Sequence, residues 1–145
     1  MTKQEYKKVE FYLYNYHKIN YLIKNRETDL IDTINVSNNA WIKSIKDTSN
    51  TIEDQAIKII DDNLIKEYKE WKKLIDNILQ ELRKYDKTKL KVVEYKFFGN
   101  IPEDVIADEL YVSKTTVRTY INDIYFEVGI LATFNNLITK SMFSS

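Results

Sequence analysis

Apolar positions recur with helical spacing along most of the chain, and residues 101–126 contain two such patterns separated by a short interruption. Ile106, Ala107 and Leu110 fall on one face of a predicted helix, where the small Ala107 allows a second helix to cross closely. Pro102 suits the first turn of this helix, because its missing N–H would be unpaired there in any case. The pattern therefore predicts a short helix that begins near Pro102 and buries one face.

A second helix is predicted to follow after a turn of about three or four residues. Ser113 is its expected cap, because a serine oxygen accepts a hydrogen bond from an N–H two or three residues on. Its inner face carries Val117, Ile121 and Ile124. Two short helices joined this tightly form the helix-turn-helix unit that places a recognition helix in the DNA major groove, although an ordinary α-hairpin has the same pattern.

The exposed face of the second predicted helix carries side chains that suit DNA. Arginine can contact guanine bidentately, asparagine can do the same with adenine, and lysine and threonine can hold phosphates or base edges. The candidate DNA-binding residues on this helix and at its cap are Ser113, Lys114, Thr115, Arg118, Thr119 and Asn122.

Charge limits how the chain would bind DNA. The 22 basic and 22 acidic residues give a formal net charge of zero, so no global field attracts nucleic acid and any contact must be local. Residues 84–98 form a positive stretch just before the two predicted helices. Its Lys87, Lys89 and Lys91 are further candidates for DNA binding, through phosphates.

This positive stretch is itself predicted to be helical over residues 88–98 and to stop at Gly99. One face of the helix would carry Leu90, Val93 and Phe97. Together with the two predicted helices that follow, the helix over residues 88–98 would complete a three-helix DNA-binding unit. Beyond Gly129, the run ILATFNNLITKSMF predicts a final helix that packs back on the N-terminal part of the chain.

Two longer amphipathic patterns precede this unit, over residues 6–34 and 52–85. The apolar seam of the second pattern consists of Leu64, Tyr68, Trp71, Ile75, Ile78 and Leu82. We predict two long helices that pair as an antiparallel hairpin or across a dimer. Residues 35–50 between them are rich in Asn and Ser and are predicted as a connection.

Several tyrosines decorate the first long predicted helix on more than one side: Tyr6, Tyr12, Tyr14, Tyr16 and Tyr21. Aromatic residues are enriched at protein interfaces, so they are candidates for a partner surface. Packing against a neighbouring helix is the alternative, and we favour it. His17, the single histidine, has no ligand partners in the sequence, so we expect no metal site.

Composition supports an all-α fold, because two Gly and one Pro are very few for 145 residues. We predict a helical hairpin for oligomerisation or partner binding at residues 1–85, and a helix-turn-helix DNA-binding domain with a tail helix at residues 86–145. The lack of cysteine excludes disulfides and thiolate chemistry. Polar residues interrupt every apolar run near the N-terminus, so neither a signal peptide nor a membrane span is expected there.

Enzymatic function is not expected. Two pairs of carboxylates, Asp61 with Asp62 and Asp104 with Asp108, have spacings that can hold Mg²⁺ in a nuclease, but such pairs are more often solvated faces. The sequence contains no glycine-rich phosphate loop, no HExxH and no Ser-His-Asp set. We therefore predict no catalytic residue and no cofactor.

The segment VIADELYVSKTTVRTYI is similar to the signature of the sigma-factor region-four class of helix-turn-helix. Together with KVEFYLYNYHKINYLI, NAWIKSI and the central charged helix, it makes the whole chain resemble the RinA family of phage late-gene transcriptional activators, which are related in layout to the ArpU type. The resemblance implies a phage-encoded protein in the bacterial cytoplasm. It would bind a promoter upstream of the packaging and structural genes and activate transcription by host RNA polymerase.

The resemblance implies roles for individual residues. Ser113 would be the cap and Val117 would lie on the inner face, and the residues towards DNA would be Lys114, Thr115, Arg118 and Thr119. Tyr111 stands where the pattern usually has glycine, and the recognition helix has fewer basic residues than usual. These departures suggest help from a dimer partner, from polymerase or from the preceding lysines.

Two other functions fit the same residues. A helical adaptor or packaging protein would use the tyrosine-rich hairpin, and the helix pair, to bind protein rather than DNA. A repressor would need the same recognition helix as an activator, so the sequence does not separate the two.

Overall fold

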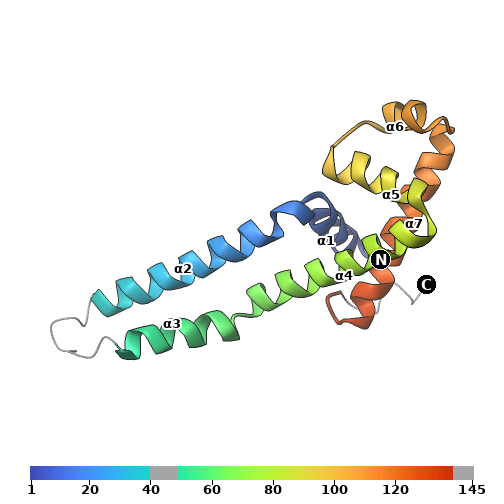
Figure 1. Ribbon diagram of the computed structural model, residues 1–145. Coiled ribbons are helices and arrows are strands. Elements are labelled where there is room, and N and C mark those ends of the chain that lie inside the picture. Colours follow the sequence, from blue (N-terminus) through green and yellow to red (C-terminus); the bar gives the residue numbers. More distant parts are fainter. Residues whose placement is uncertain (40–48, 139–145) are drawn as a thin grey trace. The chain divides into compact units, whose positions relative to one another are not determined.

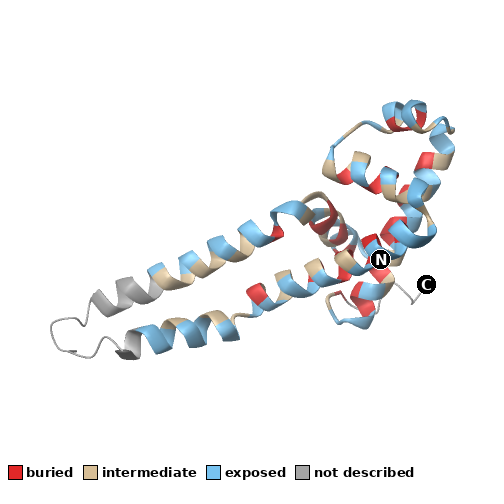
Figure 2. Ribbon diagram, viewed as in Figure 1, coloured by how far each residue is buried: buried red, intermediate tan, exposed pale blue. Residues whose placement is uncertain are grey.

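The computed structural model of the protein describes residues 1–39 and 49–138, and within them it places the side chains of residues 1–32 and 52–138. Every regular element in these ranges is a helix, which confirms the predicted all-α class. Figure 1 shows the helices along the chain, and Figure 2 shows which of their residues are buried.

The helices belong to two compact units. The larger unit contains Met1–His17 and Glu70–Ser145, and the smaller unit contains Lys18–Lys69. α4 (Asn63–Tyr85) runs from the smaller unit into the larger one. The predicted boundary at residue 85 therefore does not coincide with the boundary of either unit.

The prediction of one long helix over residues 6–34 is wrong, because the structure divides this segment into separate helices. α1 (Lys3–Tyr14) ends at Asn15, whose backbone N–H and side-chain amide both donate to the carbonyl of Phe11, at 3.0 Å and 2.8 Å. A short 3₁₀ helix, η1 (Tyr16–Lys18), follows, and α2 (Ile19–Asn39) begins after it. Asparagine side chains can bond to nearby backbone groups in place of the regular helical hydrogen bonds. Asn15 does so, and α1 ends there.

The second long predicted helix is divided as well. α3 (Ser49–Asp61) and α4 meet at Asp62, whose carboxylate accepts a hydrogen bond from the N–H of Ile65 at 3.0 Å. An aspartate that accepts such a bond acts as the N-cap of a new helix. The four-three apolar spacing continues across Asp62, so the break is not visible in the pattern of apolar residues.

The predicted connection over residues 35–50 is shorter than expected. α2 continues as a helix to Asn39, and α3 already starts at Ser49. Residues 40–48 lie outside the described part of the chain. Within the smaller unit, α2 and α3 lie side by side (Figure 1).

The core of the larger unit contains the predicted seam of α4. Trp71 is fully buried and stacks on Tyr12 of α1, with ring centroids 4.4 Å apart and an interplanar angle of 9°. Other seam residues that are buried are Ile75, Ile78 and Leu82. Leu64 and Tyr68, at the start of α4, are only half-buried.

Most of the N-terminal tyrosines pack within the chain, which confirms the interpretation that we favoured. Tyr6 stacks on Tyr125 with centroids 4.4 Å apart. The other ring contacts are Tyr12 with Trp71, Tyr14 with Phe97, and Tyr16 with Phe98. Tyr21 differs, because 64% of it is exposed on α2.

The predicted helix over residues 88–98 is confirmed, together with its stop at Gly99. α5 (Lys87–Val93) continues as a π-helix, η2 (Glu94–Phe98), and the N–H of Gly99 donates to the carbonyl of Glu94 at 2.8 Å. The spacing of apolar residues does not predict the i→i+5 hydrogen bonds of this π-helix. Val93 and Phe97 are buried, as expected for its inner face.

Two further helices complete the larger unit, α6 (Glu103–Leu110) and α7 (Lys114–Phe134). α7 continues through Gly129, so the prediction of a separate tail helix is wrong within the described residues; residues 139–145 lie outside them. The hydroxyl of Thr133 donates to the carbonyl of Gly129 at 2.8 Å, and Gly129 is buried. The C-terminal half of α7 thus supplies core instead of a new element.

Candidate nucleic-acid interface

The contact between α6 and α7 is built from the inner faces that the spacing predicted. Ile106 and Ala107 of α6 are buried, and so are Val117, Ile121 and Ile124 of α7. Pro102 is the N-cap of α6, one position earlier than the first turn. Glu103 and Asp104 occupy that turn, where the helix dipole favours negative charge.

The connection between the two helices turns at Tyr111, which adopts the left-handed conformation (φ 56°, ψ 41°). The N–H of Val112 donates to the carbonyl of Ala107 at 3.1 Å, and that of Tyr111 to Asp108 at 3.4 Å, the pair of bonds that defines a Schellman motif. Tyr111 is 95% exposed, so its side chain has almost no packing to offset the strain of a non-glycine residue in this region.

Ser113 caps α7, as predicted. Its Oγ accepts a hydrogen bond from the N–H of Thr116 at 3.0 Å and lies 2.9 Å from the hydroxyl of Thr116. The hydroxyl is thus used within the helix terminus. As a candidate for DNA binding, Ser113 would act mainly by fixing the start of α7.

The remaining candidates on α7 form one exposed face, turned away from the buried contact with α6. The exposed residues are Lys114, Thr115, Arg118, Thr119 and Asn122. We call this set the α7 face. It combines two cations with three neutral polar side chains, a composition that can contact phosphates and base edges together.

Both cations of the α7 face are paired with carboxylates of the first turn of α6. Lys114 Nζ lies 3.0 Å from Asp104 Oδ1, and Arg118 Nη2 lies 2.8 Å from Glu103 Oε2. Lys114, Arg118 and Asp104 are all more than half exposed. The Lys114–Asp104 pair is open to solvent at both ends and is worth little, so a phosphate can replace Asp104. Glu103 is only 14% exposed, so its separation from Arg118 costs more. Sequence spacing did not reveal these pairs.

The three candidate lysines of the positive stretch have different environments. Lys87 and Lys91 are exposed on α5 and remain candidates for phosphate contacts. Lys89 is not available, because its side chain is only 12% exposed and its Nζ lies 2.9 Å from Glu127 and 3.7 Å from Asp123 of α7. Burial lowers the pKa of Lys89, but the hydrogen bond to Glu127 and the nearby acidic charges outweigh it and raise the pKa. Lys89 thus joins α5 to α7.

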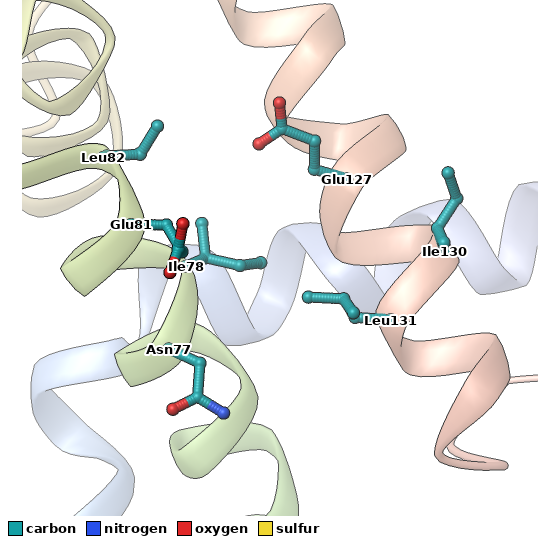
Figure 3. Close-up of a pocket in the computed structure, with 7 residues that line it drawn as sticks. All are labelled: Asn77, Ile78, Glu81, Leu82, Glu127, Ile130 and Leu131. Atoms are coloured by element: carbon teal, nitrogen blue, oxygen red, sulfur yellow. The ribbon is translucent and has the colours of Figure 1, made fainter. Parts of the chain in front are cut away.

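A groove between α4 and α7 is a second feature that the sequence did not indicate (Figure 3). It has a volume of about 470 Å³. The apolar side chains that line it are Ile78, Leu82, Ile130 and Leu131, and two carboxylates, Glu81 and Glu127, lie beside them. Its apolar lining suits a side chain of a protein partner better than nucleic acid.

One carboxylate of each pair that could serve a nuclease has another partner. Asp62 caps α4 and pairs with Arg26 at 3.0 Å, and Asp104 pairs with Lys114. Within residues 1–39 and 49–138, no cluster of His, Asp or Glu has the arrangement of a metal site. His17 packs edge-on against Phe98, with ring centroids 4.4 Å apart.

Comparison of the chain with protein-family models, with curated proteins and with solved structures finds no match. None of the described helices combines the length and the apolar character that crossing a membrane requires.

Proposed function

We propose that the protein is a sequence-specific DNA-binding transcriptional activator of phage late genes, acting with host RNA polymerase in the bacterial cytoplasm. In this proposal α6 and α7 are its helix-turn-helix, and the α7 face is its recognition surface. One observation carries the proposal: a serine-capped helix buries one side against α6 and leaves Lys114, Arg118 and Asn122 exposed on the other. The likeness of residues 105–121 to the sigma region-four signature supports the same assignment.

In the proposed complex, the N-terminal half of α7 enters the major groove. Arg118 donates to guanine and Asn122 contacts adenine, because these side chains match the edges of those bases. Lys114 contacts a phosphate, and the free N–H groups at the start of α7 favour a second one. Lys87 and Lys91 add phosphate contacts from α5.

Binding requires an exchange of partners. Arg118 leaves Glu103 and Lys114 leaves Asp104, and the carboxylates stay at the start of α6, where the helix dipole stabilises them. Because an ion pair within the chain is broken for each new contact with DNA, the net gain in binding free energy per contact is smaller. With few cations on the face, one copy would bind weakly and would depend on a linked second copy or on polymerase for affinity.

A footprint on DNA upstream of the late genes, with and without host polymerase, tests the proposal. The wild-type protein should protect a short segment next to the promoter, and polymerase should strengthen that protection. Arg118→Ala should lose it, whereas Lys73→Ala, which removes an exposed cation of α4, should keep it. In-vitro transcription from the same fragment then separates an activator from a repressor.

The groove between α4 and α7 favours a second candidate, a helical adaptor that binds protein. In that case the apolar lining with Leu82 and Leu131 would receive a partner side chain. Leu131→Glu would abolish late-gene expression and substitutions on the α7 face would leave it unchanged. The opposite outcome would support the DNA-binding function.

A further inference from the structure

A second cavity lies where η1, α4, α5 and η2 meet. It has a volume of about 410 Å³, within the range of about 300–1,000 Å³ that small-molecule sites occupy. All of its lining residues belong to the larger unit. It shares none of them with the α7 face or with the groove between α4 and α7, so it is a separate site.

The apolar part of this cavity is a wall of three packed rings beside two leucines. Phe98 stacks on Tyr16 with ring centroids 5.3 Å apart, and His17 lies edge-on to Phe98 at 4.4 Å. Leu79 of α4 and Leu90 of α5 line the cavity as well. Aromatic rings offer a large apolar surface of fixed shape, so this wall suits an apolar or aromatic group of a ligand.

Two opposite charges face the same cavity without neutralising each other. Arg83 and Glu94 both line it and both are exposed. Neither forms an ion pair or a hydrogen bond with the other, or with any further residue in the described part of the chain. A simple anion or cation is attracted by one of these groups and repelled by the other. A molecule that carries both charges can satisfy the two groups together.

Irregular helices supply both the rings and one of the charges. Tyr16 and His17 belong to the 3₁₀ helix η1, and Glu94 and Phe98 belong to the π-helix η2. π-helical turns are rare and occur frequently at functional sites. The chain thus departs from regular α-helical hydrogen bonding at two places that line one cavity, which is a second indication of a binding site.

From the ring wall, the volume and the two unpaired charges, we propose that this cavity binds a free α-amino acid with a large apolar side chain. Arg83 holds the α-carboxylate, because a guanidinium can donate two parallel hydrogen bonds to a carboxylate. Glu94 accepts a hydrogen bond from the α-ammonium group. The side chain of the amino acid packs against Phe98 and the two leucines. The site lies outside the α7 face and does not depend on the proposed function.

Isothermal titration calorimetry of the full-length protein with L-phenylalanine and L-leucine tests this site. Both amino acids should bind. Two analogues that each lack one charge, 3-phenylpropionate and 2-phenylethylamine, should bind at least about tenfold more weakly than L-phenylalanine, because each loses a hydrogen bond between charged groups. Glycine, which keeps both charges but has no side chain, should also bind more weakly.

Variants at the two charged positions identify the contacts. Arg83→Gln and Glu94→Gln should each weaken the binding of L-phenylalanine at least about tenfold. Lys84→Gln and Glu81→Gln are the matched controls, because they remove the same charges from exposed positions of α4 that do not line the cavity. Both controls should bind L-phenylalanine as the wild-type protein does.

Failure of both L-phenylalanine and L-leucine to bind at millimolar concentration would overturn the proposal. Equal affinity for L-phenylalanine and 3-phenylpropionate would also overturn it, because the protein would then recognise only an anion. Unchanged affinity in Arg83→Gln and Glu94→Gln would place the bound amino acid elsewhere and would contradict this site. The analogues are measured on the wild-type protein, so they still decide the question if a variant loses helix content.

Discussion

Arg118 on the exposed face of α7 donates a hydrogen bond to Glu103 at the start of α6, with 2.8 Å between Nη2 and Oε2. The side chain best suited to contact guanine is therefore held by a carboxylate of its own chain. Glu103 is mostly covered in this pair, with 14% of its side chain exposed. Any DNA contact by Arg118 competes with this bond.

Glu103→Gln should strengthen DNA binding, because it removes the competing charge and keeps the shape of the side chain. The dissociation constant should fall by about fivefold or more, because Glu103 is only 14% exposed and its pair with Arg118 is worth at least the roughly 1 kcal/mol at the upper end for exposed pairs. Fluorescence anisotropy with a promoter fragment measures the change. Glu109→Gln removes an exposed charge elsewhere on α6 and is the control. An equal gain in both variants would show a general charge effect instead of release of Arg118.

Tyr111→Gly should stabilise the protein by about 1 kcal/mol, because glycine adopts the left-handed conformation without the clash that a side chain causes. Little packing is lost, since Tyr111 is 95% exposed. The urea midpoint of unfolding measures the gain. Tyr111→Ala keeps the unfavourable Cβ and should give no increase, so the same shift in both variants would reject strain as the cause.

Trp71→Ala should lower the free energy of unfolding by roughly 3 to 5 kcal/mol, the usual cost of removing a buried aromatic ring. The ring is fully buried and its stacking on Tyr12 joins α4 to α1. Thermal unfolding followed by circular dichroism measures the loss. Tyr85→Ala, at a position that is 79% exposed, should unfold like the wild-type protein. A normal melting curve for Trp71→Ala would show that this contact does not hold the larger unit together.

Acid should weaken the smaller unit through Asp62. Hydrogen bonds from Arg26, at 3.0 Å and 3.2 Å, lower the pKa of this carboxyl below its ordinary value. Because its pKa is lower in the folded than in the unfolded chain, the pair stabilises fully above the unfolded pKa of about 4 and loses its effect as the pH falls through the folded pKa.

Asp62→Asn removes the charge but can still cap α4, so it should be less stable than the wild-type protein at pH 7 and should lose less stability on acidification. Urea unfolding at neutral and acidic pH measures both effects. Asp54→Asn, on the exposed surface of α3, should follow the wild-type protein. Identical pH profiles for Asp62→Asn and the wild-type protein would exclude this role of Asp62.

The sequence predicts local features of this protein better than contacts between distant residues. The cap at Ser113, the inner face with Val117 and the stop at Gly99 depend on neighbours within a few positions, and each is confirmed. The breaks at Asn15 and Asp62 were missed, because hydrogen bonds by single side chains end a helix without changing the apolar spacing.

Contacts between separate helices were not predictable in this way. Lys89 looks like any other cation of a basic stretch, and only the packing of α5 on α7 brings Glu127 within 2.9 Å of it. The same holds for the pairing of Arg118 with Glu103, which depends on how α6 crosses α7. The sequence therefore predicts which residues form the α7 face. Only the folded structure shows the carboxylates that compete with DNA for its cations.

The affinity of Arg118→Ala for the protected promoter segment tests the central claim most directly, with Lys73→Ala as the matched loss of an exposed cation. If the α7 face reads bases, Arg118→Ala should bind severalfold or more weakly, by roughly 1 to 3 kcal/mol. Its helix content should be unchanged, and Lys73→Ala should bind as the wild-type protein does. Equal affinity of all three proteins for that segment would contradict a role of α7 in DNA recognition.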